Sequence, residues 1–279
     1  MTDFPEPELD DATVAAYLQR IGAARPARPT AAALRELHER HVMTVPFETV
    51  DVHLRRPHAT GRRAIDKIVH RRRGGICYEL NGAFAALLRA LGYEVTMLAG
   101  RVSDGGVLGP VFGHMLLLVT TADSPGQWLA DVGYGRGARH PLRFGSRGTQ
   151  QDPQGVFRLA EAPYGDLDLF RDDVLQYRFE TRPRAAEDFH PMCWWHYNAP
   201  DSPHMTHLYC TLPTPGGRVT LSGDTLTLRE NGRRVRTVLD GEEELRQAYR
   251  AWFGIELDEL PPLPVSPARA EETNQEMSV

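Results

Sequence analysis

Apolar residues recur at helical spacing along the N-terminal third of the chain. Positions three or four apart are apolar in residues 11–21, and a second such stretch follows Thr30, a helix-capping residue, to about residue 41. A shorter helix is expected over about residues 64–72. The last stripe runs from Leu80 to Leu91 and closes at Gly92, a residue that commonly ends a helix. The pattern therefore predicts a helical domain over residues 1–92.

After Gly92 the pattern changes to short apolar runs separated by glycine, proline and polar residues, which is typical of strands. Strands are predicted at 93–102, 114–121 and 128–132, with a glycine-rich loop at 103–113, and later at 208–212, 219–222, 225–229 and 234–239, before an amphipathic helix at 242–253. We expect an α+β chain of several domains. They are a β-barrel-like domain over residues 93–198, a small α/β lid over 199–260, and a disordered, proline-containing tail over 261–279.

One cysteine stands where a helix is predicted to begin. Cys77 follows Gly74 and Gly75 and precedes the apolar stripe, which places it in or just before the first turn. The free N–H groups and the helix dipole favour an anion there, and thiols at such sites ionise readily. The glycines are expected to let the backbone turn tightly and to leave the sulfur uncovered on one side. A nucleophile is one interpretation, and a buried structural cysteine is the other.

A histidine and an aspartate follow on neighbouring predicted strands. His114 opens one strand and Asp131 lies near the end of the next. If the two strands pair antiparallel, these residues become neighbours, and a helix packed on the sheet can point Cys77 at His114. The three would then be a nucleophile, a base and an orienting carboxylate. Taken singly, each residue favours a plainer interpretation, His114 as a strand-end histidine with a local partner and Asp131 as a turn residue before Gly133.

The chain at this point resembles the arylamine N-acetyltransferases. The resemblance runs from about residue 17 to about residue 257 and rests on four motifs in the order and spacing of that family. They are Val45-Pro46-Phe47-Glu48, Arg73-Gly74-Gly75-Ile76-Cys77-Tyr78-Glu79 followed by Asn81-Gly82, Gly113-His114, and Asp131-Val132-Gly133-Tyr134-Gly135.

The resemblance implies a Cys-His-Asp core like that of cysteine proteases and transglutaminases. It also implies helices, then a barrel-like sheet, then a lid. In such an enzyme Cys77 takes the acetyl group from acetyl-CoA, releases CoA, and passes the acetyl group to an arylamine or arylhydrazine nitrogen in a ping-pong reaction. Acetyl-CoA is then a cosubstrate, and neither a tightly bound cofactor nor a catalytic metal is expected.

The resemblance also assigns supporting residues. Phe47 and Tyr134 are implied to line the aryl pocket, although plain core packing is the alternative for both. Glu48 and Arg73 are expected to form a structural ion pair, unless they are simply exposed. By the same resemblance, Asn81 supports the site structurally, and Gly133 and Gly135 belong to a loop at the cosubstrate.

The chain departs from the family pattern at one place. The stretch Tyr197-Asn198-Ala199-Pro200 stands where the family usually has Ser-Thr-His-Pro, a segment that helps receive CoA. This departure leaves open an amide synthase of the same superfamily, which would release a polyketide from an acyl carrier protein by aryl-amide formation. A thioester hydrolase, a transglutaminase-like enzyme and a binding protein without activity are further alternatives.

Histidines and cysteines near residue 200 suggest a competing metal site. His190, Cys193 and His196 are spaced by threes, and so are His204, His207 and Cys210. Residues three apart point to opposite faces of a strand, so these could chelate a metal only from a helix or a turn. Prolines at 191, 200 and 203 argue against a helix, which favours histidines without a metal.

Composition limits the remaining classes. A net charge of −5 over 279 residues gives no electrostatic reason to expect nucleic acid or an anionic membrane as a partner, although the basic run at 70–73 could meet a phosphate. No apolar segment approaches the ~20 residues that span a bilayer. The acidic start of the chain does not resemble a signal peptide, and three widely spaced cysteines suit a reducing compartment. We therefore expect a cytoplasmic protein.

Overall fold

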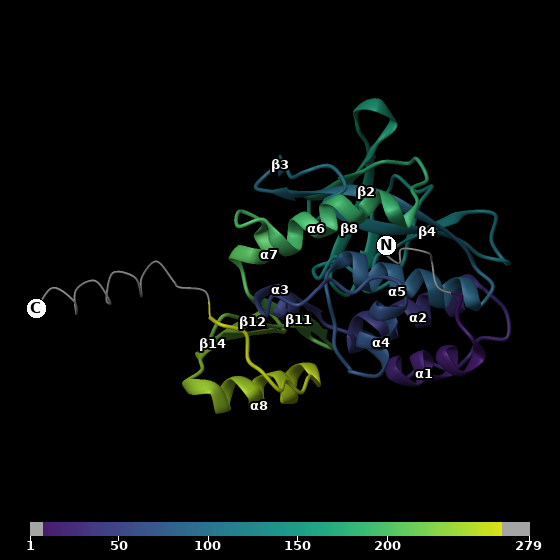
Figure 1. Cartoon of the computed structure of the whole chain (residues 1–279). Coiled ribbons are helices and arrows are strands. Elements are labelled where there is room, and N and C mark those ends of the chain that lie inside the picture. The colour runs from purple at the N-terminus through teal and green to yellow at the C-terminus, as the bar shows by residue number, and fades with distance from the viewer. Residues whose placement is uncertain (1–7, 264–279) are drawn as a thin grey trace, which may run out of the picture.

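The computed structural model describes residues 8–263 as a mixed α/β protein. Helices α1, α2, α4 and α5 gather beneath the large sheet that contains β2 and β4, while β11, β12, β14 and α8 form a separate body beside the helices (Figure 1). Helices α6 and α7 lie above that body (Figure 1). The site described below lies where the helices meet both sheets.

The N-terminal helices begin and end close to the predicted positions. Helix α1 (Asp11–Ile21) is capped by Asp10, which accepts from the Thr13 N–H at 2.8 Å. Helix α2 (Ala31–Thr44) is capped by Thr30, as predicted. Helix α4 covers Arg62–Val69, and α5 covers Cys77–Ala90, so that Cys77 is the first helical residue. The prediction of Cys77 at a helix start is confirmed.

The large sheet is antiparallel, with the strand order β6-β5-β4-β2-β10-β9-β8-β7 and β3 paired with β2. It curls into a nearly closed, barrel-like layer (Figure 1). The predicted strands at 93–102, 114–121 and 128–132 are β2 (Glu94–Asp104), β4 (His114–Thr120) and β5 (Gln127–Ala130). The others are β3 (Val107–Leu108), β6 (Leu142–Arg143), β7 (Gln150–Asp152), β8 (Gly155–Glu161), β9 (Leu167–Arg171) and β10 (Val174–Phe179).

The second sheet has the order β1-β11-β12-β13-β14 and is also antiparallel. Strand β1 (Phe47–Glu48) comes from the N-terminal third, and Phe47 pairs with Thr211 of β11. A residue of the predicted helical domain is therefore held directly by the C-terminal sheet. The remaining elements are α3 (Val50–His53), β11 (Tyr209–Thr214), β12 (Gly217–Ser222), β13 (Thr225–Glu230), β14 (Arg233–Val238) and α8 (Gly241–Phe253).

The region around residue 200 is helical, which the prolines had argued against. Helix α6 covers His190–Asn198, and α7 covers Pro203–Thr206. Pro191 and Pro203 each lie at the start of a helix, where the missing N–H is not needed, and Pro200 falls between the two helices. The argument against a helix was wrong because it did not consider where in a helix each proline would fall.

Two sequence expectations concern the remaining segments. No helix within residues 8–263 is long and apolar enough to cross a membrane. The tail predicted at 261–279 lies, from residue 264 onward, outside the described residues.

The two glycines before Cys77 are required by space and not by a turn. The chain makes no turn at Gly74 or Gly75, and neither has a positive φ, so the expectation of a tight turn there was wrong. A Cβ on Gly74 would lie 1.9 Å from the Pro46 carbonyl oxygen, and one on Gly75 would lie 2.3 Å from Glu79 Oε2. Their missing side chains let the strand at Phe47 and the start of α5 approach each other.

A pair of glycine substitutions tests this account. Gly74→Ala should lower the free energy of unfolding by about 3 kcal/mol, because the Pro46 backbone cannot move away without disturbing β1. Gly82→Ala should raise it by roughly 0.5–1 kcal/mol, because Gly82 lies inside α5 with open space where a Cβ would be. Urea unfolding of both variants measures the difference. Equal effects of the two substitutions would contradict the packing argument.

Candidate active site

Cys77 lies at the N-terminus of α5, the end at which the helix dipole favours a negative charge. The expectation that its sulfur is uncovered on one side was wrong, because the residue is only 2% exposed. The loop at Gly133 packs against the Cys77 backbone: a Cβ on Gly133 would lie 2.8 Å from the Cys77 Cα. The start of α5 and the loop that follows β5 are therefore in direct contact at Cys77.

His114 and Asp131 are neighbours, as the antiparallel pairing predicted. Strands β4 and β5 pair with Leu117 opposite Ala130, which brings the start of one strand beside the end of the other. His114 Nε2 lies 2.8 Å from Asp131 Oδ2 in a buried hydrogen bond. The Cys77 side chain lies close enough to His114 to raise the pKa of the imidazole.

The charges of the pair stabilise each other. Burial alone would lower the pKa of His114, but Asp131 and the Cys77 thiol raise it to about 10. Burial alone would raise the pKa of Asp131, but the charge of His114 and hydrogen bonds from His114, Asn81 and Tyr177 hold it below its usual value. At neutral pH the pair is therefore an imidazolium and a carboxylate.

Asn81 ties the helix that carries Cys77 to both strands. Its Nδ2 donates to the Met115 carbonyl at 2.7 Å and to Asp131 Oδ1 at 2.9 Å. Its Oδ1 accepts from the Val132 N–H at 3.0 Å. One side chain thus fixes the distance from α5 to β4 and to the end of β5.

Two further residues hold Asp131 and His114, and no local pattern in the sequence singles them out. Tyr177 of β10 hydrogen-bonds Asp131, and its ring lies 5.1 Å from the His114 ring. His38 of α2 accepts the Asp131 N–H at 3.1 Å through Nε2, which fits the pKa of about 4 to which burial lowers it. In the sequence Tyr177 reads as a core position of a strand and His38 as part of a helix, and only the tertiary fold brings them to the site.

The aromatic residues assigned by resemblance are buried beside this group. The Tyr134 ring lies 5.5 Å from the His114 ring, and its hydroxyl donates to the Gln176 carbonyl at 3.2 Å. The Phe47 ring stacks on Tyr209 with centroids 5.4 Å apart. Gly135, with φ of 75°, lets the loop after Asp131 pass directly over the Phe47 ring.

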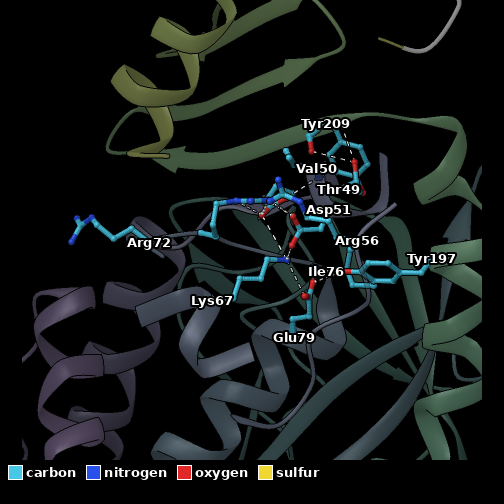
Figure 2. A network of polar contacts seen from close by, with 12 residues as sticks. Thr49, Val50, Asp51, Arg56, Lys67, Arg72, Ile76, Glu79, Tyr197 and Tyr209 are labelled. Carbon is cyan, nitrogen blue, oxygen red and sulfur yellow. Dashed lines mark hydrogen bonds and ion pairs between the residues drawn. The ribbon is translucent and has the colours of Figure 1, made fainter. Parts of the chain in front are cut away.

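Glu48 and Arg73 form an ion pair that is buried and not exposed. Arg73 Nη2 lies 2.7 Å from Glu48 Oε1 and 3.1 Å from Asp51 Oδ1. Lys67 of α4 joins them through Asp51 Oδ2 at 2.9 Å. Figure 2 shows this network, in which Lys67 also reaches Glu79 of α5.

The histidines near residue 200 pack around α6 and α7. No group of three or more His, Cys, Asp or Glu side chains within residues 8–263 is arranged to hold a metal ion. Ser202, just after the stretch Tyr197-Asn198-Ala199-Pro200, is fully buried. Its hydroxyl donates to the His196 carbonyl at 3.0 Å and accepts from the His204 N–H at 3.3 Å, so this hydroxyl joins the two helices.

Comparison with known proteins agrees with this architecture. A family model described as N-acetyltransferase matches residues 30–260. The chain is 34% identical over 255 residues to an arylamine N-acetyltransferase / N-hydroxyarylamine O-acetyltransferase of Salmonella typhimurium, covering 88% of this chain and 89% of that protein.

Solved structures give the same result. The structure of a Nocardia farcinica arylamine N-acetyltransferase has a TM-score of 0.79 at 38% identity, covering 90% of each chain. That of a Mycobacterium marinum arylamine N-acetyltransferase in complex with CoA has a TM-score of 0.80 at 31% identity, covering 87% of this chain and 92% of the other. The chain therefore belongs to the arylamine N-acetyltransferase family.

Proposed function

We propose that the protein transfers the acetyl group of acetyl-CoA to the nitrogen of an arylamine or arylhydrazine through a thioester on Cys77. The observation that carries the proposal is the buried hydrogen bond from His114 to Asp131, together with a Cys77 side chain close enough to raise the pKa of the same imidazole. Membership of the family and the CoA complex of a relative support acetyl-CoA as the donor. No resident cofactor takes part in this scheme.

In the resting enzyme His114 has already taken the thiol proton as an imidazolium, and the first half-reaction begins when the Cys77 thiolate attacks the acetyl carbonyl carbon. The bond from that carbon to the sulfur of CoA breaks, and the imidazolium gives its proton to the departing CoA thiolate. The products are acetylated Cys77, neutral His114 and free CoA. Asp131 fixes the ring and stabilises its cation throughout.

In the second half-reaction the arylamine attacks the Cys77 thioester. Aromatic amines are weak bases, so they arrive neutral and nucleophilic. Neutral His114 takes the amine proton as the carbon–sulfur bond breaks, which restores the thiolate and the imidazolium. The N–H of Cys77 lies in the first turn of α5, where no intrahelical acceptor is available, and we assign it as an oxyanion donor.

The aryl ring of the acceptor would lie against Phe47 and Tyr134. Both rings are buried and close to the reacting group, Tyr134 through its edge contact with His114. The loop that carries Gly133 and Gly135 would meet the cosubstrate, because it packs directly against Cys77. The three cysteines are free, which suits the reducing cytosol in which we place the enzyme.

Intact mass spectrometry without any amine tests the donor. Incubation with acetyl-CoA should add one acetyl group, which digestion should locate on Cys77, and an aromatic amine should then remove it. Cys77→Ser should fold normally and form no adduct, because a hydroxyl is far too weak an acid for His114 to ionise. A protein that stays unmodified while Cys77 remains reactive would refute acetyl-CoA as donor and point to a carrier-bound acyl group.

Substitution of Asp131 tests the ring partner. Asp131→Asn should slow acetylation of Cys77 by roughly 10³–10⁴-fold, because the amide favours the wrong imidazole tautomer. The pKa of His114 should also fall from about 10, since Asp131 is the main cause of its elevation. In the wild type the His114 imidazolium should be lost only as the pH rises through about 10, and the rate of Cys77 acetylation should fall with it. In the variant both losses should occur at lower pH. A rate within threefold of wild type would contradict the assignment.

Alkylation distinguishes Cys77 from the other cysteines. Burial raises the pKa of Cys193 and of Cys210 well above the usual value, and neither has a histidine partner like His114. Iodoacetamide at pH 7.5 should therefore label the native protein on Cys77 at least about tenfold faster than on the other two. Peptide mapping gives the three rates. Equal rates would favour a protein that keeps the fold without the activity.

A further inference from the structure

Glu79 lies two residues after Cys77 and is completely buried. Its Oε2 accepts the Ile76 N–H at 2.9 Å and the Tyr197 hydroxyl at 3.0 Å, while its Oε1 accepts Lys67 Nζ at 2.9 Å. Three donors from three parts of the chain thus converge on one side chain (Figure 2). Because all three are donors, the arrangement requires the carboxylate form of Glu79.

The contact with Ile76 connects this carboxylate to the reacting thiol. Ile76 is the residue before α5, and its N–H would otherwise have no acceptor at the buried start of the helix. Glu79 fixes that peptide, and the next residue along the chain is Cys77. Gly75 also approaches the same carboxylate closely, so the segment that precedes Ile76 packs against Glu79 as well. A small shift of Glu79 would therefore move the sulfur relative to His114.

Tyr197 connects the Glu79 carboxylate to α6. The residue is 5% exposed, and burial raises the pKa of its hydroxyl well above the usual value, so it remains a donor throughout the working pH range. It belongs to the stretch Tyr197-Asn198-Ala199-Pro200, in which the chain departs from its family. The proposed mechanism gives this hydroxyl no role.

We propose that Tyr197 is a positioning residue for the nucleophile: its hydroxyl holds the Glu79 carboxylate against the Ile76 N–H and so fixes the Cys77 thiol in line with His114. This inference rests on the proposed acetyl transfer. It assigns a role in that reaction to a residue of α6, whereas Cys77 lies on α5. It predicts that Tyr197 affects the rate of Cys77 acetylation and not the affinity for acetyl-CoA.

The surroundings of Glu79 determine the expected pH dependence. Burial raises the pKa of Glu79 above its usual range, although Lys67 opposes this. As the pH falls through this raised pKa, the carboxylate is lost and the rate of acetylation should fall with it. Without the Tyr197 hydroxyl the pKa rises further, so the fall should occur at higher pH. Three kinds of charged or titratable group surround Glu79. The cations are Lys67, Arg73 and, at the edge of the cluster, Arg56, and the other carboxylates are Glu48 and Asp51. Helix α6 contributes Cys193 and Tyr197.

The test is the acetylation half-reaction of the full-length Tyr197→Phe variant. The release of CoA in the absence of amine is measured as a function of time between pH 5 and pH 9. We expect the maximal rate constant of Cys77 acetylation to fall three- to tenfold at neutral pH. The acid limb of the profile should move to higher pH, and the concentration of acetyl-CoA at half-saturation should stay within twofold of wild type.

Tyr93→Phe is the matched control. It also removes one partly buried tyrosine hydroxyl, which donates to the Thr30 carbonyl at 3.1 Å. Tyr93, however, lies beyond the C-terminal end of α5, and Cys77 is at the N-terminal end. At 14 residues that end is roughly 20 Å from Cys77. The control should keep the wild-type rate and pH profile, and thermal melting of both variants shows whether each is folded at the assay temperature.

The outcomes separate this inference from the proposed function. If the wild type is not acetylated, the proposed function fails. If the wild type is acetylated and Tyr197→Phe has the same rate and the same acid limb, the positioning role is overturned. A raised half-saturation concentration with an unchanged maximal rate would also overturn it, because the residue would then act on donor binding.

Discussion

The arrangement depends on Asn81, whose side chain binds the helix that carries Cys77 to β4 and to the segment after β5. Its amide donates to β4 at Met115 and to the Asp131 carboxylate, and its oxygen accepts from the loop after β5. An amide is suited to this position because it offers donors and an acceptor in one plane. With the helix fixed in this way, the register of β4 and β5 decides where His114 lies, and the three side chains of the proposed site meet without any of them being adjacent in sequence.

A second constraint is the charge buried at the start of α5. Three carboxylates, Glu48, Asp51 and Glu79, share the buried cations Lys67 and Arg73. Taking such groups out of water is costly, and ion pairs of this kind often add little to stability compared with apolar residues. Their contribution here is to fix the relative positions of helices and strands, because each carboxylate accepts from a donor that belongs to a different element. The cluster therefore joins β1, α3, α4 and α5 next to Cys77.

Local patterns predicted what depends on local physics. Helix α1 was predicted to the residue, Cys77 was placed at a helix start, and the pairing of two strands placed His114 beside Asp131. Contacts between distant elements could not be predicted in this way. Tyr177 and His38 have no local signal because strand order and helix packing bring them to Asp131. The helix α6 was missed because the effect of Pro191 depends on its position in the helix, which the sequence pattern alone does not fix.

The glycines in the motifs explain why the site is recognisable in the sequence at all. A Cβ on Gly74, Gly75 or Gly133 would lie within 2.8 Å of other atoms at the site, and in no case is the obstacle only the free end of a flexible side chain. Gly75 meets a carboxylate that three donors hold in place, and Gly133 meets the Cys77 backbone. A catalytic side chain can sit on many scaffolds, but backbones packed this closely around a thiol tolerate only glycine. The close approach of three segments, more than the identity of the reacting groups, thus leaves its pattern in the sequence.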